Sequence, residues 1–328
     1  MKIVIVSLYF PPRVGGLENI MYGLAQRWHE MGHTVTVFTT TPGKDRYDFE
    51  VIRSLSLLKL WIAVRHGDVF VEANISLKTT WVGFLYRKKW FVIHHALYDG
   101  GEYLKRKLKR CFILFSNNIA VSNFIASTLP ADSTVIPNFY DEVIFRKLPE
   151  IRRDKEIVFL GRLVSDKGLH LLVKALHILA SQRVYYTLTV IGEGPERESI
   201  IKLVDECHLQ DRVEFVGPKK GQELVAILNQ HQVLVVPSVV NESFGIVVLE
   251  GLACGCKVVV SNGGGLSEAA GSFGVLFKSG DTDDLAKEIR VAMDENMQLN
   301  WVQLQNYLDD RTSVKIALKY IEEFLLRL

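Results

Sequence analysis

Two cations follow an apolar run in the second half of the chain. Arg162 and Lys167 lie in the loop 160–168 (LGRLVSDKG), directly after the run 157–160. Where a strand ends and a helix begins, both side chains can converge on a diphosphate, the guanidinium as a planar fork and the ammonium as a point charge. Their charges can then replace those of a metal ion. The alternative is that both are ordinary solvated loop cations.

Two carboxylates follow a later apolar run. They are Glu242 and Glu250, in the segment NESFGIVVLE after residues 233–236. If a helix begins near Phe244, Glu242 lies in the loop at its mouth and Glu250 lies about 9 Å further along the axis. That separation suits a nucleotide sugar, and ribose hydroxyls would satisfy Glu250 in its apolar surroundings. Taken singly, one would be a capping residue and the other an exposed helix glutamate.

Adjacent glycines and adjacent histidines mark the first half. Gly15 and Gly16 lie between the first strand candidate and a helix that begins near Leu17. Their amides can approach an anion at the helix N-terminus, where the dipole favours phosphate; a tight turn is the alternative. His94 and His95 end another strand candidate. A histidine there can hydrogen-bond a sugar hydroxyl or a developing charge, and a structural role is equally open.

The elements that must position these residues alternate along the chain. Short β-branched runs separate longer stretches of helical period, which predicts βα units and parallel sheets. The strand candidates are 2–7, 33–40, 68–72, 90–94, 118–122 and 134–136, then 157–160, 186–191, 213–216, 233–236, 258–261 and 274–277. Helices of the second half are expected to begin near Gly168, Pro195, Gly221, Gly245 and Asp281. The fold class is therefore α/β, with two Rossmann-like, doubly wound domains.

Length predicts two domains. A chain of 328 residues exceeds one ordinary core and suits two domains of roughly 150 residues. The charged segment 141–155 is the expected joint. Residues 313–328 have helical period and no strand partner, so we expect the first domain to comprise 1–148 with 313–328 and the second 149–312. Open α/β sheets bind ligands beyond the carboxyl ends of their strands, which predicts an active-site cleft where the two domains face each other.

The composition excludes several classes. With 48% hydrophobic and 23% charged residues, the chain is a packed globular protein. A net charge of +2 gives no overall field for nucleic acid, so we expect no nucleic-acid partner. No apolar run approaches the roughly 20 residues that span a bilayer, and the four cysteines lack the spacing of a zinc site or a disulfide framework. These features predict a protein of the cytoplasm.

One basic segment adjoins an apolar one. Residues 105–110 (KRKLKR, from Lys105 to Arg110) precede the run 111–115 (CFILF). Such a face can contact anionic lipid headgroups at about 1 kcal/mol per cation. An anionic membrane surface is therefore one partner hypothesis, with the protein peripheral at the inner face of the membrane. A solvated helix face above a packed one is the alternative.

Together these motifs resemble glycosyltransferase family four, the retaining transferases of the GT-B fold. The resemblance extends over nearly the whole chain and is most specific in FLGRLVSDKG, LTVIGEGPER, VEFVGP and ESFGIVVLEGLACGCKVVVSNGGGLSE. It implies transfer of a hexose-type sugar from a nucleoside diphosphate sugar, UDP-sugar first and GDP-mannose next, to a saccharide or lipid-linked acceptor. It implies a place in cell-surface polysaccharide or glycan biosynthesis. The first domain would bind the acceptor and the second the donor.

The resemblance also implies roles at the leaving group. Arg162 and Lys167 would clamp the diphosphate in place of a metal, and Gly15 and Gly16 would offer amides to the donor phosphates. Backbone around Gly217 would contact the base. No metal and no cofactor is implied, because the nucleotide sugar is a substrate.

Further roles follow for the ribose and the sugar. Glu250 would hold the ribose hydroxyls. Glu242 would meet the transferred sugar and the distal phosphate, together with the amides of Phe244, Gly245 and Ile246.

The family's first-domain histidine matches His95 best, by its distance from the preceding strand, and His94 stays open. The catalytic candidates implied are His95, Glu242, Arg162 and Lys167. The chain departs from the family in its short first domain, which leaves the acceptor least defined, and in an aromatic pair, Phe139 and Tyr140, where such hinges often have glycine.

Other functions remain to be distinguished. A nucleotide-sugar epimerase or a phosphorylase with the same two-domain fold would need further acid–base groups. A non-catalytic nucleotide-sugar-binding partner of a transferase would bind the donor without transferring the sugar. The spelling Asp281-Thr282-Asp283 resembles a metal-binding Asp-x-Asp, but it is better interpreted as the capped start of a helix. The segment 192–195 (GEGP) lacks the third glycine of a dinucleotide-binding loop.

Overall fold

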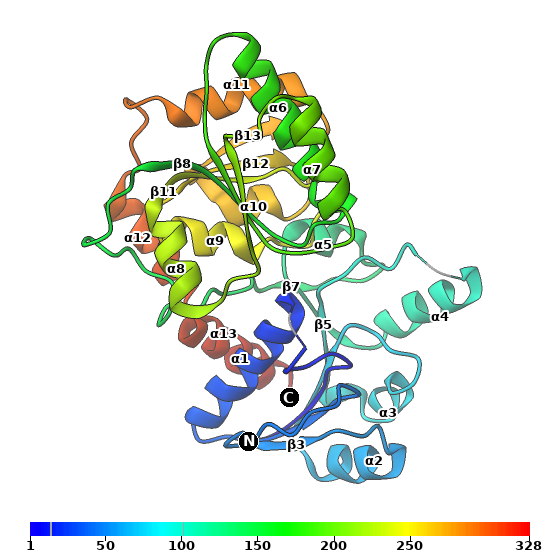
Figure 1. Ribbon diagram of the computed structural model, residues 1–328. Coiled ribbons are helices and arrows are strands. Elements are labelled where there is room, and N and C mark those ends of the chain that lie inside the picture. Colours follow the sequence, from blue (N-terminus) through cyan, green and yellow to red (C-terminus); the bar gives the residue numbers. More distant parts are fainter. Residues whose placement is uncertain (14, 101) are drawn as a thin grey trace. The chain divides into compact units, whose positions relative to one another are not determined.

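The computed structural model describes residues 1–13, 15–100 and 102–328, so Val14 of the loop before Gly15 lies outside the described residues. The chain forms two compact units (Figure 1). Unit 1 comprises Met1–Phe139 and Asp310–Leu328, and unit 2 comprises Tyr140–Asp309. Each unit is a parallel sheet with helices packed on it, and each is described by itself below.

In the described part of unit 1, seven strands pair in the order β3-β2-β1-β4-β5-β6-β7. They are β1 (Lys2–Val6), β2 (Thr34–Phe38), β3 (Glu50–Ile52), β4 (Val69–Ala73), β5 (Trp90–His94), β6 (Asn117–Ala120) and β7 (Thr134–Val135). All neighbours are parallel, and β1, β4 and β5 consist almost entirely of buried residues because helices cover both faces. The order of winding reverses between β1 and β4, where ligands of such sheets bind.

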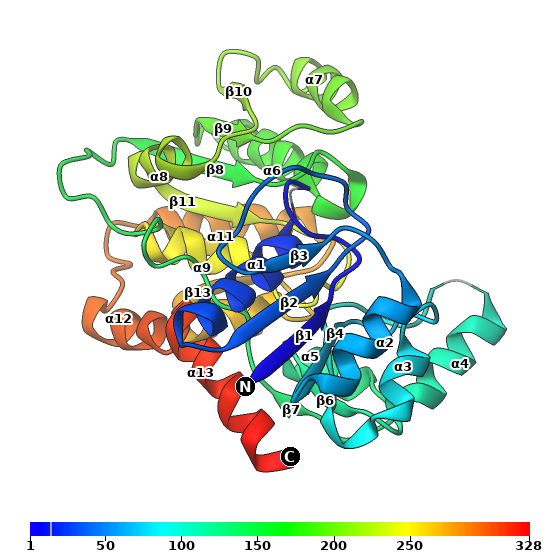
Figure 2. The same cartoon turned by 90° about the horizontal axis from the view of Figure 1, so that it is seen from below.

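The helices of unit 1 lie on both faces of this sheet (Figures 1 and 2). They are α1 (Gly16–Glu30), α2 (Leu57–His66), α3 (Thr80–Leu85), the 3₁₀ turn η1 (Arg87–Lys89), α4 (Tyr103–Ile113), α5 (Asn123–Thr128) and α13 (Ser313–Arg327). Helix α13 returns from the far end of the chain to pack on α1. The Trp28 indole donates a hydrogen bond to the Ala317 carbonyl at 3.1 Å, and its ring lies 5.5 Å from that of Phe324.

Unit 2, which the structure describes throughout, has six parallel strands in the order β10-β9-β8-β11-β12-β13. They are β8 (Lys155–Leu160), β9 (Leu188–Ile191), β10 (Val213–Gly217), β11 (His231–Val236), β12 (Lys257–Asn262) and β13 (Gly274–Lys278). The winding is again doubly wound, and its switch point lies between β8 and β11.

The helices of unit 2 connect these strands. They are the 3₁₀ turn η2 (Ser165–Lys167), α6 (Leu169–Ser181), α7 (Arg197–Glu206), α8 (Gly221–Gln230), α9 (Ile246–Ala253), α10 (Leu266–Ala270), the 3₁₀ turn η3 (Gly271–Phe273), α11 (Thr282–Met293) and α12 (Trp301–Asp309). Apolar residues of α6 such as Leu172 and Leu176 recur at helical spacing and pack with the sheet and α11 in one core.

Several details differ from the sequence predictions. Strand β3 was not predicted, and α9 begins at Ile246 rather than near Phe244. The boundary between the units lies after Phe139 rather than after residue 148, so residues 140–148 belong to unit 2. There the Leu148 amide donates to Asn229 Oδ1 at 2.8 Å, and the Asn229 amide nitrogen donates to the Arg146 carbonyl at 3.0 Å.

Two features of the sequence have simple structural outcomes. Asp281 Oδ1 accepts a hydrogen bond from the Asp284 amide at 3.1 Å. Asp281 is therefore the N-cap of α11, as predicted for the segment Asp281-Thr282-Asp283. No helix of the described residues is both long enough and apolar enough to cross a membrane.

Candidate functional site

The loop after β8 is fixed against the loop after β11. Gly168 has φ of +68°, and a Cβ atom there would lie 1.9 Å from the Pro237 carbonyl oxygen, so only glycine fits this close approach. The Val239 amide donates to the Asp166 carbonyl at 3.0 Å. These contacts place Lys167, the last residue of η2, next to the segment that follows β11.

Lys167 and Glu242 form an ion pair at the switch point of unit 2. Lys167 Nζ lies 2.8 Å from Glu242 Oε1, and both side chains are largely buried. The Ser238 hydroxyl donates a hydrogen bond to the same carboxylate. Arg162, in the same loop as Lys167, is exposed, and within the described residues its side chain has no hydrogen bond or ion pair. One cation is thus held by an acid, and the other is available to an anion.

Helix α9 begins four residues after Glu242 of this ion pair. Gly245 precedes the helix with φ of +96°, and a Cβ there would lie 2.3 Å from Leu266 Cδ2. The Gly265 amide donates to the Glu242 carbonyl at 2.7 Å, so the glycine-rich loop after β12 holds the backbone of Glu242. The first amides of α9, beginning with Ile246, have no partner within the helix and form its positive end. Phe244, which precedes Gly245, is buried.

Glu250 lies one turn into α9, closer to the helix start than predicted. Burial chiefly, and the charge of Asp141 in addition, raise the pKa of its carboxyl to about 7. Part of the residue remains exposed, and no described residue donates a hydrogen bond to its carboxylate. A ligand hydroxyl could therefore occupy the acceptor positions that the protein leaves open.

Gly217 ends β10 with φ of +71°, next to a polar hollow of about 460 Å³. The hollow is lined by Gly217 and by residues of the loop after β9, namely Glu193, Gly194, Pro195, Arg197 and Glu198. This is the place in unit 2 where the sequence predicted contacts to a base.

The glycine loop of unit 1 contains an acid that sequence reasoning missed. Glu18, in the first turn of α1, is almost fully buried and pairs with Arg13 Nε at 3.1 Å. Its carboxylate folds back over Gly15, where a Cβ atom would lie 2.4 Å from Glu18 Oε2. Gly15 and Gly16 therefore begin α1 as predicted, with a carboxylate and not an open space beside Gly15.

His94 is a structural residue. Its Nδ1 lies 2.8 Å from the Tyr98 hydroxyl and its Nε2 lies 2.9 Å from Asn118 Oδ1. The Tyr98 oxygen accepts from the Ile75 amide, so its own proton goes to Nδ1 and the imidazole is neutral with its proton on Nε2. Burial lowers the pKa of this histidine to about 4.

His95 has a free ring nitrogen. Its Nε2 is buried and has no hydrogen-bond partner among the described residues. Burial first, and the neighbouring His94 second, lower its pKa to about 3, so the ring is neutral at pH 7. The backbone of His95 is held by Asn74, whose Oδ1 accepts from the His95 amide at 2.7 Å. Asn74 directly follows β4 and lies in the left-handed region, with φ of +62°.

The structure thus brings together two sets of candidates. In unit 2, Arg162, Lys167, Glu242, Gly245 and Glu250 lie on loops and helix starts at the carboxyl ends of β8 and β11. In unit 1, Gly15, Gly16 and His95 follow β1 and β5, at the carboxyl edge of that sheet. Ser238, Asn74 and Glu18 were missed. A polar residue within two positions of the end of a buried strand was the signal for the first two.

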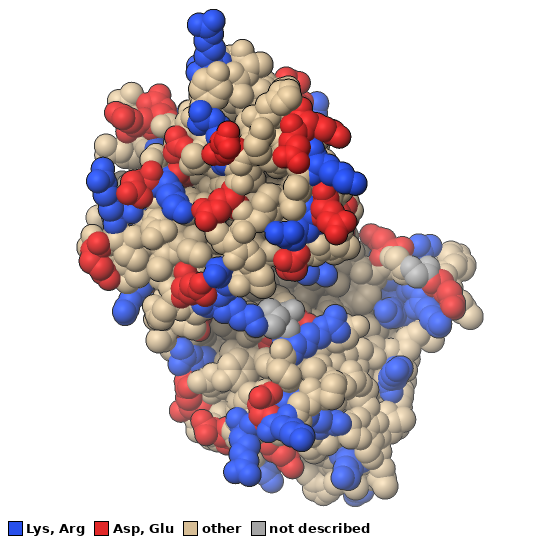
Figure 3. Space-filling view, in the orientation of Figure 1, with Lys and Arg blue, Asp and Glu red and all other residues tan. Residues whose placement is uncertain are grey.

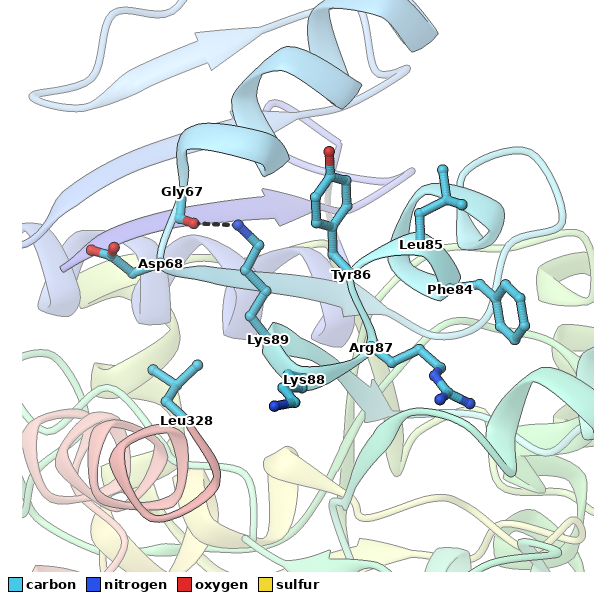
Figure 4. Close-up of a pocket in the computed structure, with 9 residues that line it drawn as sticks. All are labelled: Gly67, Asp68, Phe84, Leu85, Tyr86, Arg87, Lys88, Lys89 and Leu328. Atoms are coloured by element: carbon cyan, nitrogen blue, oxygen red, sulfur yellow. Dashed lines mark hydrogen bonds between the residues drawn. The ribbon is translucent and has the colours of Figure 1, made fainter.

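A second hollow, of about 650 Å³, lies in unit 1 and is lined by none of the candidate site residues (Figure 4). Its lining includes Phe84, Leu85 and the three cations of η1. Lys89 Nζ donates to the Gly67 carbonyl and caps the end of α2, as the dashed line in Figure 4 shows.

The two doubly wound sheets define an α/β fold of the GT-B class, so the predicted fold class is confirmed. The Anabaena protein HepE in complex with UDP matches the chain with a TM-score of 0.83 at 19% identity, covering 100% of both chains. Sucrose-phosphate synthase from Thermosynechococcus elongatus matches with a TM-score of 0.80 at 21% identity, covering 99% of this chain and 98% of its own.

The chain belongs to the family of group 1 glycosyl transferases, whose match extends over residues 141–309. That range coincides almost fully with unit 2. The gpi3 subunit of phosphatidylinositol N-acetylglucosaminyltransferase from Schizosaccharomyces pombe is 24% identical over 323 residues, covering 86% of this chain and 70% of its own. The glycosyltransferase MJ1607 of Methanocaldococcus jannaschii is 28% identical over 324 residues, covering 82% of each chain.

Proposed function

We propose that this glycosyltransferase moves a hexose-type sugar from a nucleoside diphosphate sugar to a saccharide or lipid-linked acceptor, with retention at the anomeric carbon and without a metal ion. The observation that carries this proposal is the arrangement at the switch point of unit 2. An unpaired Arg162, a Lys167 held by Glu242 and the N-terminus of α9 lie on adjoining loops there.

The charges of this arrangement suit the departure of a diphosphate. The bond between the sugar C1 and the donor phosphate oxygen breaks, and a bond between C1 and the acceptor oxygen forms on the same face. The acceptor proton passes to the departing phosphate oxygen, and the nucleoside diphosphate leaves. Arg162, Lys167 and the α9 dipole stabilise the negative charge that develops on the leaving group.

The ion pair with Glu242 gives Lys167 a fixed position before the donor arrives. A preorganised cation loses little freedom when the charge develops, which is why such groups contribute strongly to catalysis. We propose that Glu250 accepts hydrogen bonds from the ribose hydroxyls, and that His95 Nε2 contacts the transferred sugar. Glu242 serves as the partner of Lys167 and, through the adjoining amides, lines the sugar site.

Replacing the clamp tests this proposal. We expect Lys167→Ala and Arg162→Ala each to lower kcat/KM for transfer by roughly 100-fold or more, because each removes a charge from the leaving group. Lys174→Ala, which removes an exposed cation from α6 of the same unit, is the control and should keep normal activity. Near-normal turnover in the Lys167 variant, or loss of wild-type activity on addition of a chelator, would overturn the proposed clamp.

The donor is best identified by thermal shift. A ligand that binds only the folded state raises the melting temperature. At a concentration of 100 times its Kd, it adds about 2.7 kcal/mol to the free energy of unfolding. We propose a UDP-sugar, because the structural neighbour HepE was solved with UDP and the sequence favoured it. A panel of UDP-, GDP-, ADP- and TDP-sugars should therefore give its largest shift with UDP-sugars.

Product analysis separates the remaining alternatives. A transferase with its acceptor yields a glycosylated product and free nucleoside diphosphate. An epimerase would yield an isomeric nucleotide sugar, and a non-catalytic binding partner would return the donor unchanged. Either result would replace the proposed reaction while leaving nucleotide binding intact.

A further inference from the structure

Helix α4 presents its apolar stripe to solvent. Leu104, Leu108, Cys111 and Phe115 follow one another at spacings of four, three and four residues, so they lie on one face of the helix and the turn after it. The one fully buried residue of the helix is Ile113. At about 100° per residue, Ile113 points away from that stripe.

This arrangement reverses the usual one. A surface helix of a globular protein turns its apolar stripe toward the core and its charges toward water. Here Leu104 is 75% exposed and Leu108 is 45% exposed. In Figures 1 and 2, α4 lies at the outer edge of unit 1, beyond α3.

Cations flank the stripe on both sides. Lys105 and Lys107 are exposed at its two edges, and the half-buried Lys109 lies further round the helix. In Figure 3 both basic and acidic side chains lie in the region of α4, and the acid that pairs with Lys105 is Glu102, at 3.1 Å. A positively charged border around an apolar stripe is complementary to a surface with anionic headgroups above hydrocarbon.

The adjoining helix extends the same surface. The ring of Phe84, on α3, lies 5.3 Å from that of Phe115, and the Arg87 guanidinium lies 5.5 Å from the Phe115 ring. Leu85 and Lys88, next to them on the hollow of Figure 4, are also exposed. Exposed apolar and basic side chains thus continue from α4 onto α3 and η1.

We propose that α4 lies flat in the headgroup region of an anionic bilayer, with its apolar stripe inserted and Lys105 and Lys107 on the lipid phosphates. Insertion buries the part of the stripe that the described protein leaves exposed, and the flanking cations select anionic over neutral lipid. This inference goes beyond the proposed transfer reaction, because it predicts binding to lipid alone, without donor or acceptor.

Vesicle flotation of the full chain tests the proposal. We expect wild type to bind vesicles of phosphatidylcholine with phosphatidylglycerol at least about tenfold more tightly than vesicles of phosphatidylcholine alone. The double variant Leu104→Ser/Leu108→Ser should lose about tenfold or more of that binding. Its control is Val302→Ser/Val291→Ser, which alters two helix residues of unit 2 with 73% and 45% exposure.

Two double variants that each remove two lysines test the part of the flanking cations. Lys105→Gln/Lys107→Gln should remove most of the preference for anionic vesicles, whereas Lys174→Gln/Lys202→Gln, with the same change in net charge on α6 and α7, should keep it. Equal binding of wild type to both vesicle types, or equal binding by stripe and control variants, would overturn the proposal. So would a dimer in sedimentation that the leucine variant dissociates, because a second copy would then cover the stripe.

Discussion

Two adjacent histidines at the end of β5 differ in what their rings contact. His94 has both nitrogens in hydrogen bonds with Tyr98 and Asn118, whereas His95 keeps a buried Nε2 without a partner among the described residues. The sequence left both open, because adjacent residues at a strand end carry no signal of which ring meets neighbours far along the chain. A neutral imidazole at His95 can contact a sugar without adding charge.

Substitution separates the two roles. We expect His94→Ala to lower the free energy of unfolding by about 3 kcal/mol, since it leaves two buried polar groups unpaired. His95→Ala should instead lower kcat/KM roughly 100-fold with little loss of stability. Urea unfolding and initial rates measure the two effects. If the His94 variant is the one that loses turnover while remaining stable, the assignment is reversed.

The carboxyl of Glu250 gives donor binding a pH dependence. Its pKa is about 7 in the empty protein, so the carboxylate form that accepts hydrogen bonds from hydroxyls becomes populated as pH rises through 7. The affinity for UDP should therefore increase by up to about tenfold between pH 6 and 8. Titration calorimetry on Glu250→Gln isolates this part, because the variant retains only the ionisation of UDP itself. Identical pH profiles would contradict a ribose contact by Glu250.

At the scale of elements, glycines set how closely the loops of unit 2 approach. We expect Gly168→Ala to lower stability by more than about 2 kcal/mol and to lower activity, because its Cβ would meet the Pro237 carbonyl and displace Lys167. Gly280→Ala is the control: φ is also positive, at +78°, but nothing lies within 4 Å of the added Cβ. Similar losses in both variants would show that backbone strain alone matters.

Strand β4 contains a buried acid that organises the start of α3. The carboxylate of Glu72 accepts hydrogen bonds from the hydroxyls of Thr79 at 2.6 Å and Thr80 at 2.9 Å, and from the Trp90 indole at 3.3 Å. Burial outweighs these bonds and raises the pKa of Glu72 to about 7. The folded protein thus holds a proton here that the unfolded chain releases at lower pH.

The stability should therefore fall as pH rises. For a carboxyl whose pKa increases from 4.5 when unfolded to about 7 when folded, the stabilisation is complete below pH 4.5 and is lost by pH 7, a change of about 3 kcal/mol. Glu72→Gln keeps an acceptor for both threonines and should remove that decline. Urea unfolding at pH 5 and pH 8 measures it, and an unchanged decline in the variant would refute the assignment to Glu72.

The sequence was most informative where an element is buried on both faces. The runs 90–93 of β5 and 233–236 of β11 are β-branched or apolar throughout, so they predicted central parallel strands. Strand β3 was missed because only Glu50–Ile52 pair and none is fully buried. The start of α9, at Ile246, was predicted to within one or two residues, but the contact that leaves no room for a side chain at Gly245, with Leu266, is one that only the fold supplies.

The site followed the same rule. Charged residues in the loops that follow strands were found, because their place in a βα unit is local information. The partners that orient them were not: Ser238 on Glu242, and Asn74 on the backbone of His95, are contacts that depend on how loops meet.

At the scale of the whole molecule, unit 1 is closed by a helix that follows unit 2 in the chain. Phe324 of α13 is fully buried, with its ring 4.6 Å from that of Phe91 and 5.5 Å from that of Trp28. Each unit has its own core, so we expect calorimetry to resolve two unfolding transitions, of which a bound nucleotide chiefly raises that of unit 2.

Phe324→Ala should lower the transition of unit 1 alone, by about 3 to 5 kcal/mol of stability. Leu326→Ala, at an 81% exposed position of the same helix, should change neither transition measurably. A single transition that shifts as a whole in the Phe324 variant would show that the two units unfold together.

The position of α13 also determines the order in which the protein can be completed during synthesis. The ribosome delivers every residue of unit 2 before Ser313–Arg327 emerges, so unit 2 can finish folding while the nascent unit 1 still exposes the apolar side of α1. Chaperones that bind exposed apolar surface would therefore act on unit 1, whose residues 1–139 are synthesised first.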